Sequence, residues 1–259
     1  MGFLTDLVAE RRRALERHPL DDSTLLARAL AMPPARDFVG ALRASAGRPA
    51  VIAEVKRASP SAGAIADRDP GEQARAYASA GAAAISVLTD QANFNGSLAD
   101  LRAARMACDL PVLRKDFLIH PSDLIESRAA GADAVLLIAA CLSANELVAM
   151  LAAARDLGLG ALVETHSDQD LDTALATDAE VVGVNARDLE TLDVDVERAL
   201  AHLRRIPAGR LSVMESGIAT RDQVRAAVDA GASAILVGEA LMRADDPGVK
   251  LRELLGEES

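Results

Sequence analysis

The chain has 259 residues, half of them hydrophobic and only 2% aromatic, so its core has to be built from aliphatic side chains. This length suits two small domains or one α/β barrel, because barrels often form a single unit of about 250 residues. A formal net charge of −11 and the scarcity of aromatic side chains argue against a surface for nucleic acid or for an anionic membrane.

The first 48 residues predict a helical extension. We expect helices over 3–17, 23–32 and 36–46, separated by prolines. The apolar residues of the first helix fall on one side, namely Phe3, Leu4, Leu7, Val8 and Leu15. The basic run ERRRALER in the same helix is interpreted as a solvated face.

Nothing in the sequence predicts export or a membrane span. The first residues lack the apolar core of a signal peptide, and no run approaches the roughly 18 apolar residues that a spanning helix needs. Cys108 and Cys141 form no CxxC motif, so neither a disulfide framework nor a structural zinc site is predicted. We expect a cytoplasmic protein in which Cys141, after an apolar run, is buried.

From residue 50 onward, short aliphatic runs alternate with Ala-rich helical stretches. Each run is followed by a helix candidate, which is typical of parallel strands covered by helices. The eight expected strands are 51–56, 84–89, 111–115, 134–139, 161–165, 181–185, 211–216 and 234–238.

A faint internal repeat supports a closed barrel. Gly81, Gly131 and Gly231 each follow a helix candidate, where a helix end needs a positive φ. Eight such units, with no GxGxxG after the first strand, favour a (β/α)8 TIM barrel over a doubly wound open sheet. We therefore expect one structural domain, made of a helical extension over 1–48 and a barrel over 49–259.

Polar residues gather where the predicted strands end, and active sites of parallel barrels lie at the carboxyl ends of their strands. These residues are Glu54, Lys56, Lys115, Asp116, Glu164, Asn185, Arg187, Glu215, Ser216, Gly238 and Glu239. A structural ion-pair plug is one interpretation, because charges inside a barrel need partners. A functional site is favoured, because the opposite strand ends show nothing comparable.

Two of these residues are lysines in a chain that otherwise uses arginine. Of 28 basic residues, 25 are Arg, and the lysines are Lys56, Lys115 and Lys250. Lysine can give up a proton when it is partly buried, whereas arginine stays protonated. Lys56 and Lys115 are therefore candidates for acid chemistry, although burial and nearby carboxylates shift a lysine pKa in opposite directions.

Glycine turns after the last two strands suggest an anionic ligand. Gly217 follows the seventh strand and Gly238 the eighth, where barrels often bind phosphate at a short helix. The turn from Ser59 to Gly63 after the first strand adds hydroxyl groups nearby.

Nine motifs occur in this order along the chain: AEVKRASPSAG, ISVLTD, FNGS, PVLRKDF, GADAVLLI, LVETH, VGVNARDL, ESGI and LVGEALM. Together they resemble the indole-3-glycerol-phosphate synthase family of tryptophan biosynthesis, and the helical extension also fits that family. The resemblance implies a carboxy-lyase that needs no metal and no organic cofactor. Its substrate would be 1-(2-carboxyphenylamino)-1-deoxyribulose 5-phosphate, a small phosphorylated anthranilate sugar. The products would be indole-3-glycerol phosphate, CO2 and water.

The resemblance also implies roles for the ionisable strand ends. Lys115 would be the general acid and Glu164 the general base. Lys56 would pair with the substrate carboxylate and could serve as a second acid. Glu54 and Glu215 would position the lysines and the substrate hydroxyls.

The remaining site residues follow from the same resemblance. Asn185 would hold the region of the reacting hydroxyl, and Arg187 would lie near the mouth. The anthranilate pocket would be lined by Phe94, Phe117, Leu136, Leu189 and Leu236. The phosphate would be surrounded by Ser59, Ser216, Gly217, Gly238 and Glu239, with the Glu239 side chain turned away from it.

Some positions depart from the family pattern, among them Ala186, His120 and Ser122. They leave every proton donor and acceptor in place. We expect His18, His120 and His202 to be surface or cap residues. Near Glu164, His166 has too few partners for a metal site, and the stretch that follows it starts a helix with acidic residues in the first turn.

Three alternatives differ in what they require. A phosphoribosylanthranilate isomerase would be expected to use a Cys and Asp pair, and no Cys ends the first strand. A tryptophan synthase alpha chain is a second phosphate barrel of the same pathway. A non-catalytic barrel could bind a phosphorylated metabolite without turnover. Oligomeric state is not encoded in these motifs, and a monomer is our expectation.

Overall fold

The computed structural model describes residues 2–17, 22–45, 48–59, 63–64 and 68–257. Eight parallel strands form a closed barrel in the order β1-β10-β9-β8-β7-β6-β5-β4, which confirms the predicted (β/α)8 architecture. They are β1 Ala50–Val55, β4 Ala84–Leu88, β5 Val112–Lys115, β6 Ala134–Ile138, β7 Gly160–Thr165, β8 Val181–Asn185, β9 Leu211–Glu215 and β10 Ala234–Val237. Every boundary lies within one residue of the predicted one.

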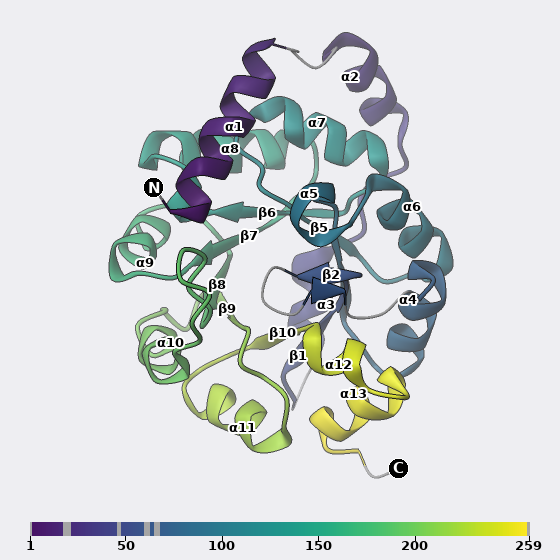
Figure 1. Ribbon diagram of the computed structural model, residues 1–259, viewed down its shortest axis with the longest axis vertical. Helices are drawn as coiled ribbons and strands as arrows, with labels where there is room; N and C mark the ends of the chain where they lie inside the picture. The colour runs from purple at the N-terminus through teal and green to yellow at the C-terminus, as the bar shows by residue number, and fades with distance from the viewer. Residues whose placement is uncertain (1, 18–21, 46–47, 60–62, 65–67, 258–259) are drawn as a thin grey trace.

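The helices form a ring around the strands (Figure 1). They are α4 Pro70–Ser79, α6 Leu98–Ala107, α7 Pro121–Ala130, α8 Ala144–Asp156, α9 Asp168–Leu175, α10 Val196–Leu203, α11 Arg221–Asp229, α12 Glu239–Arg243 and α13 Pro247–Leu255. Three short elements join them: the hairpin of β2 Ala58–Ser59 and β3 Gly63–Ala64, the helix α5 Gln91–Phe94, and the 3-10 turn η1 Ala139–Cys141.

Helix ends follow the local signals in the sequence. Gly81, Gly131 and Gly231 have φ values of 89°, 98° and 102°, as predicted for the turn between a helix and the next strand. Ser167 caps α9, and two aspartates occupy its first turn, which favours the positive end of the helix dipole. The register of each strand is therefore set by turns that are short and conformationally specific.

The core is aliphatic, as the composition required. Cys141 is also buried, as predicted. Phe38 is an exception to the aliphatic pattern, because its ring packs against Gly160 at the amino end of β7 and is 1% exposed. It closes the amino end of the barrel.

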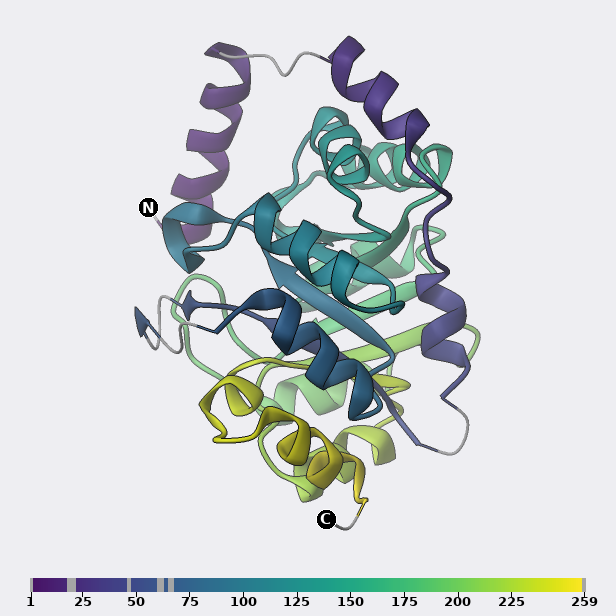
Figure 2. The same ribbon diagram turned by 90° about the vertical axis from the view of Figure 1, so that its right-hand side faces the viewer.

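The three helices of the extension lie in different places. They are α1 Phe3–Arg17, α2 Asp22–Ala31 and α3 Phe38–Arg43. Figure 2 shows α1 and the β2–β3 hairpin at one end of the barrel and α3 at the other. The predicted apolar side of α1 packs on the barrel, with Leu4 buried and Leu7 partly buried. Only α1 lies on the side of the strand ends that carry the predicted site.

One expectation about polar residues held in part and another was wrong. Glu10, Arg12 and Arg13 are exposed, as a solvated face requires, but Arg11 is only partly exposed and its guanidinium lies 2.8 Å from the buried carboxylate of Asp123. His202 is neither a surface residue nor a cap but is buried in the last turn of α10. His120 does cap α7, as expected, and His18 lies outside the described residues.

The amino ends of the strands also hold a buried charge, which the sequence analysis overlooked. Asp133 is fully buried and accepts hydrogen bonds from the backbone of Arg36 at 2.8 Å and of Val112 at 2.9 Å. The guanidinium of Arg105 lies 3.2 Å from the same carboxylate. All of these groups are paired, so the cluster serves the fold.

None of the helices formed by the described residues combines the length and the apolar character needed to cross a membrane.

Candidate active site

A pocket opens at the carboxyl ends of the barrel strands. Of the seventeen predicted site residues it is lined by sixteen: Glu54, Lys56, Phe94, Lys115, Phe117, Leu136, Glu164, Asn185, Arg187, Leu189, Glu215, Ser216, Gly217, Leu236, Gly238 and Glu239. The remaining one, Ser59, ends β2, and its side chain falls outside the description. With Leu88 of β4 also in the lining, residues from all eight barrel strands meet in one place.

Lys115 lies between two carboxylates at the floor of this pocket. Its ammonium donates to Glu164 at 2.8 Å and to Glu215 at 3.3 Å. Asn185 donates to the other oxygen of Glu164 at 3.0 Å. The glutamates are almost fully buried, whereas the Lys115 side chain keeps 15% exposure and faces the pocket.

These contacts separate the pKa values of the three groups. Burial alone would lower the pKa of Lys115, but the carboxylates of Glu164, Glu215 and Glu54 outweigh it and raise that pKa. Burial alone would raise the pKa of Glu164, but Lys115 and the hydrogen bonds it accepts lower it. Burial and the charge of Glu164 raise the pKa of Glu215 well above its usual range. The environment of the pocket floor thus moves the pKa values of Glu164 and Glu215 in opposite directions around the ammonium of Lys115.

A second ion pair lies on β1. Lys56 and Glu54 are 3.1 Å apart, and both side chains are largely buried at the pocket wall. Because residues two apart on a strand face the same side, this pair points into the barrel beside the Lys115 cluster. The pocket therefore contains two ammonium groups and three carboxyl groups.

Two glycines make room for these glutamates. A Cβ on Gly238 would lie 2.3 Å from an oxygen of Glu54, and a Cβ on Gly183 would lie 2.2 Å from an oxygen of Glu215. Any side chain would displace the carboxylate it faces. Gly238 was predicted for a different reason, as a phosphate contact, and Gly183 was not singled out at all.

Part of the pocket lining is apolar. The rings of Phe94 and Phe117 lie 6.4 Å apart between centroids, in a tilted arrangement. The pocket lining includes five residues that the sequence analysis did not single out: Leu88, Ile138, Leu192, Ile218 and Val237. It also includes Asp116, which was noted at a strand end but given no role. Most of them could have been found from their position, because they end strands or directly follow predicted site residues.

The rim after β9 and β10 has the expected tight turns. Ser216 and Gly217 have φ values of 63° and 71°, and Gly238 directly precedes α12. The Glu239 side chain accepts from Arg243 at 3.0 Å and lies 3.7 Å from Arg187. Its carboxylate is thus drawn to basic side chains beside the rim.

His166 contacts two parts of the site rather than a metal. Its ring nitrogens lie 3.1 Å from the carbonyl oxygen of Asn185 and 3.1 Å from the carboxylate of Asp188. Asp188 in turn accepts from the backbone of Glu190, next to the pocket residue Leu189. Among the described residues, no three His, Cys, Asp or Glu side chains are grouped so that they could hold a metal ion.

Comparison with known proteins places this chain in a family. The family model described as "Indole-3-glycerol phosphate synthase" matches residues 4–254. The indole-3-glycerol phosphate synthase of Polaromonas naphthalenivorans is 51% identical, over 86% of each chain. Indole-3-glycerol phosphate synthase 2 of Streptomyces coelicolor is 49% identical, over 98% of this chain and 99% of that one. The chain belongs to the indole-3-glycerol phosphate synthase family.

Members of this family are carboxy-lyases of tryptophan biosynthesis, so the chain is an enzyme of that class. Among solved structures, 3-hexulose-6-phosphate synthase matches with a TM-score of 0.63 at 18% identity, over 81% of this chain and all of that one. A tryptophan synthase alpha-subunit from Pyrococcus furiosus matches with a TM-score of 0.61 at 16% identity, over 81% and 98%. At this level of identity the two likenesses support the barrel fold alone.

The three positions that depart from the family pattern have structural contacts of their own. Ala186 is fully buried behind the end of β8. His120 and Ser122 contact each other at 2.7 Å and build the cap of α7. None of the three lines the pocket.

Proposed function

We propose that the pocket converts 1-(2-carboxyphenylamino)-1-deoxyribulose 5-phosphate to indole-3-glycerol phosphate, CO2 and water. The observation that carries this proposal is the position of Lys115, an ammonium held 2.8 Å from Glu164 in a mostly buried cup beside an apolar wall. The family of the chain supports the same reaction.

Lys115 is the general acid of the proposed reaction. As the ring carbon attacks the substrate ketone, the ketone oxygen gains negative charge and needs a proton. The three nearby carboxyl groups raise the pKa of Lys115, so it is in its acid form before the substrate arrives. An arginine could bind an anion there but could not donate a proton, which accounts for the lysine.

Glu164 is the general base that removes the last proton from the ring intermediate. Its pKa is lowered by Lys115 and by the hydrogen bond from Asn185, so it is ionised at neutral pH. Environments that move two neighbouring groups apart in pKa are typical of an acid and base pair. Loss of CO2 restores the aromatic benzene ring. The hydroxyl then leaves as water with a proton from an ammonium, for which Lys56 is the second acid, while Glu164 takes the proton from the ring intermediate. The two acids give two protons and the base takes one, so the net reaction takes up one proton.

The other pocket residues bind the substrate. Lys56 faces the pocket and would pair with the anthranilate carboxylate, while the apolar wall with Phe94 and Phe117 takes the ring. The turns at Gly217 and Gly238 would hold the phosphate at the rim. Glu54 and Glu215 orient the two lysines.

The test is direct conversion of the substrate, followed by the fluorescence of the indole product in the presence of a chelator. We expect turnover by the wild-type chain and a loss of about 10²–10⁴-fold in kcat for Lys115→Ala, the range of general acid catalysis. The matched control is Lys250→Ala, because Lys250 pairs with Glu253 on α13 and does not line the pocket. Binding without turnover by the wild type would indicate a non-catalytic barrel and contradict the proposal.

A further inference from the structure

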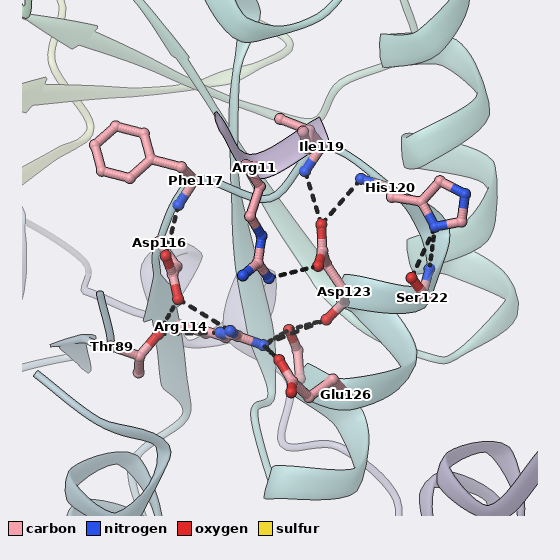
Figure 3. A network of polar contacts seen from close by, with 11 residues as sticks. Arg11, Thr89, Arg114, Asp116, Phe117, Ile119, His120, Ser122, Asp123 and Glu126 are labelled. Carbon is pink, nitrogen blue, oxygen red and sulfur yellow. Dashed lines mark hydrogen bonds and ion pairs between the residues drawn. The ribbon is translucent and has the colours of Figure 1, made fainter. Parts of the chain in front are cut away.

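The segment between β5 and α7 is held by two carboxylates, one partly and one fully buried (Figure 3). The first is Asp116, which accepts from the backbone of Phe117 at 2.8 Å. Its other oxygen accepts from Arg114 at 2.9 Å and from Thr89 at 2.5 Å. These contacts all come from β5 and its neighbour β4, so they are internal to the barrel.

The second carboxylate depends on a residue from outside the barrel. Asp123 is fully buried and accepts from the backbone of Ile119 and of His120, each at 3.0 Å. Its other oxygen accepts from the guanidinium of Arg11 at 2.8 Å. Arg11 is on α1, 112 residues earlier in the chain, and in Figure 3 it reaches in between the two carboxylates.

The amino end of α1 contacts a second loop of the site. The Glu190 carboxylate accepts from the backbone of Leu4 and Thr5, each at 3.3 Å, and from the Thr5 hydroxyl at 3.2 Å. Glu190 directly follows Leu189, which lines the pocket. Leu4 and Arg11 are seven residues apart, so about 10 Å of helix joins the loop after β8 to the loop after β5.

We propose that Arg11 is a positioning residue for the substrate: from α1 it holds the segment that places Phe117 in the pocket wall. This inference rests on the proposed function, since Phe117 belongs to the wall that would take the anthranilate ring. A buried carboxylate needs compensation for its charge. Without Arg11, Asp123 has only backbone donors, and it regains solvation by loosening residues 117–120.

The kinetic test compares two neighbouring arginines of the same helix. Arg11→Met removes the contact with Asp123, while Arg12→Met removes an exposed ion pair with Glu146 on α8. We expect Arg11→Met to raise KM about tenfold with kcat within about threefold, because it disturbs binding and not the acid or base. Arg11→Lys keeps the charge and should recover most of the affinity. Arg12→Met should match the wild type.

A second readout needs no turnover. Amide hydrogen exchange of residues 117–120 should increase in Arg11→Met and stay unchanged in Arg12→Met. Should Arg11→Met not fold, Glu190→Gln offers the same comparison for the other end of α1, because Glu190 is exposed and its loss leaves the core intact.

The outcomes separate this inference from the proposed function. A lower melting temperature in Arg11→Met with unchanged KM and unchanged exchange at 117–120 would make the pair purely structural and overturn the inference. A wild-type chain that converts no substrate would overturn the proposed function, while the exchange comparison would still decide the role of Arg11.

Discussion

The two ends of the barrel both bury charged groups, yet they treat them differently. At the amino end, Asp133 has two backbone donors and the guanidinium of Arg105 around one carboxylate. At the carboxyl end, Lys115 is shared by Glu164 and Glu215, and one oxygen of Glu215 is buried with no hydrogen-bond partner among the described residues.

This difference distinguishes a structural charge from a functional one. A buried polar group in a finished network stabilises one conformation, whereas an unsatisfied group is a site that a ligand can complete. The surplus of carboxyl groups around Lys115 raises its pKa and keeps the donor charged. Around Asp133 there is no such surplus of carboxyl groups over the cation that pairs with them.

The largest expected effect comes from changing the donor while keeping its charge. Lys115→Arg preserves a cation beside Glu164 and Glu215 but removes a group able to lose a proton at working pH. We expect kcat to fall about a thousandfold, roughly 4 kcal/mol in transition-state free energy. Steady-state kinetics measure this, with circular dichroism as the check on folding. A variant that keeps a tenth of the wild-type rate would remove Lys115 from the role of acid.

The matching change at the amino end should affect stability and not activity. Asp133→Asn leaves Arg105 without its carboxylate in a buried setting, which typically costs about 3 kcal/mol. Urea unfolding measures the loss, and kcat and KM should stay at wild-type values. A fall in kcat would contradict the view that the charged groups at the amino end serve stability and those at the carboxyl end serve the reaction.

Glu215→Gln tests the raised pKa of Glu215. The folded-state pKa of Glu215 is raised above 4.5, so between 4.5 and that higher value the unfolded chain releases a proton that the folded chain keeps. The stability contributed by this group is therefore full below 4.5 and is lost as the pH rises. We expect the wild type to lose stability relative to Glu215→Gln as pH increases above 4.5. A difference that does not change with pH would show that Glu215 is already ionised.

The smallest effect is expected at His202, which belongs to neither end. Burial lowers its pKa below 6.5, more than the nearby Asp168 raises it. The folded chain therefore binds this proton less readily, and stability should fall as the pH drops below 6.5. Thermal melts of the wild type and His202→Leu should show a shallower decline in the variant. Parallel declines would assign the pH dependence to other groups.

The barrel and most of the pocket could be predicted because their signals are local. Strands from Ala50 to Val237 follow runs of aliphatic residues, and Gly131 marks a helix end by its required conformation. Parallel strands then bring their carboxyl ends together by geometry alone. That is why Lys56 and Lys115 could be expected in one pocket.

The missed features depend on partners far apart in the chain. Arg11 lies 112 residues from Asp123, and the backbone of Arg36 lies 97 residues from Asp133. No periodicity links such positions, so ERRRALER looked like an exposed surface. The direction of the Lys115 pKa shift was equally inaccessible, because it depends on distances to three carboxyl groups.

The glycines opposite the glutamates have a consequence for engineering. Glu215 and Glu54 occupy the volume that the missing side chains of Gly183 and Gly238 leave free. Each glycine and the glutamate it faces therefore have to be changed together when a new side chain is introduced at either position. An alanine scan that varies these glycines singly would report the displaced glutamate along with any role of the glycine itself.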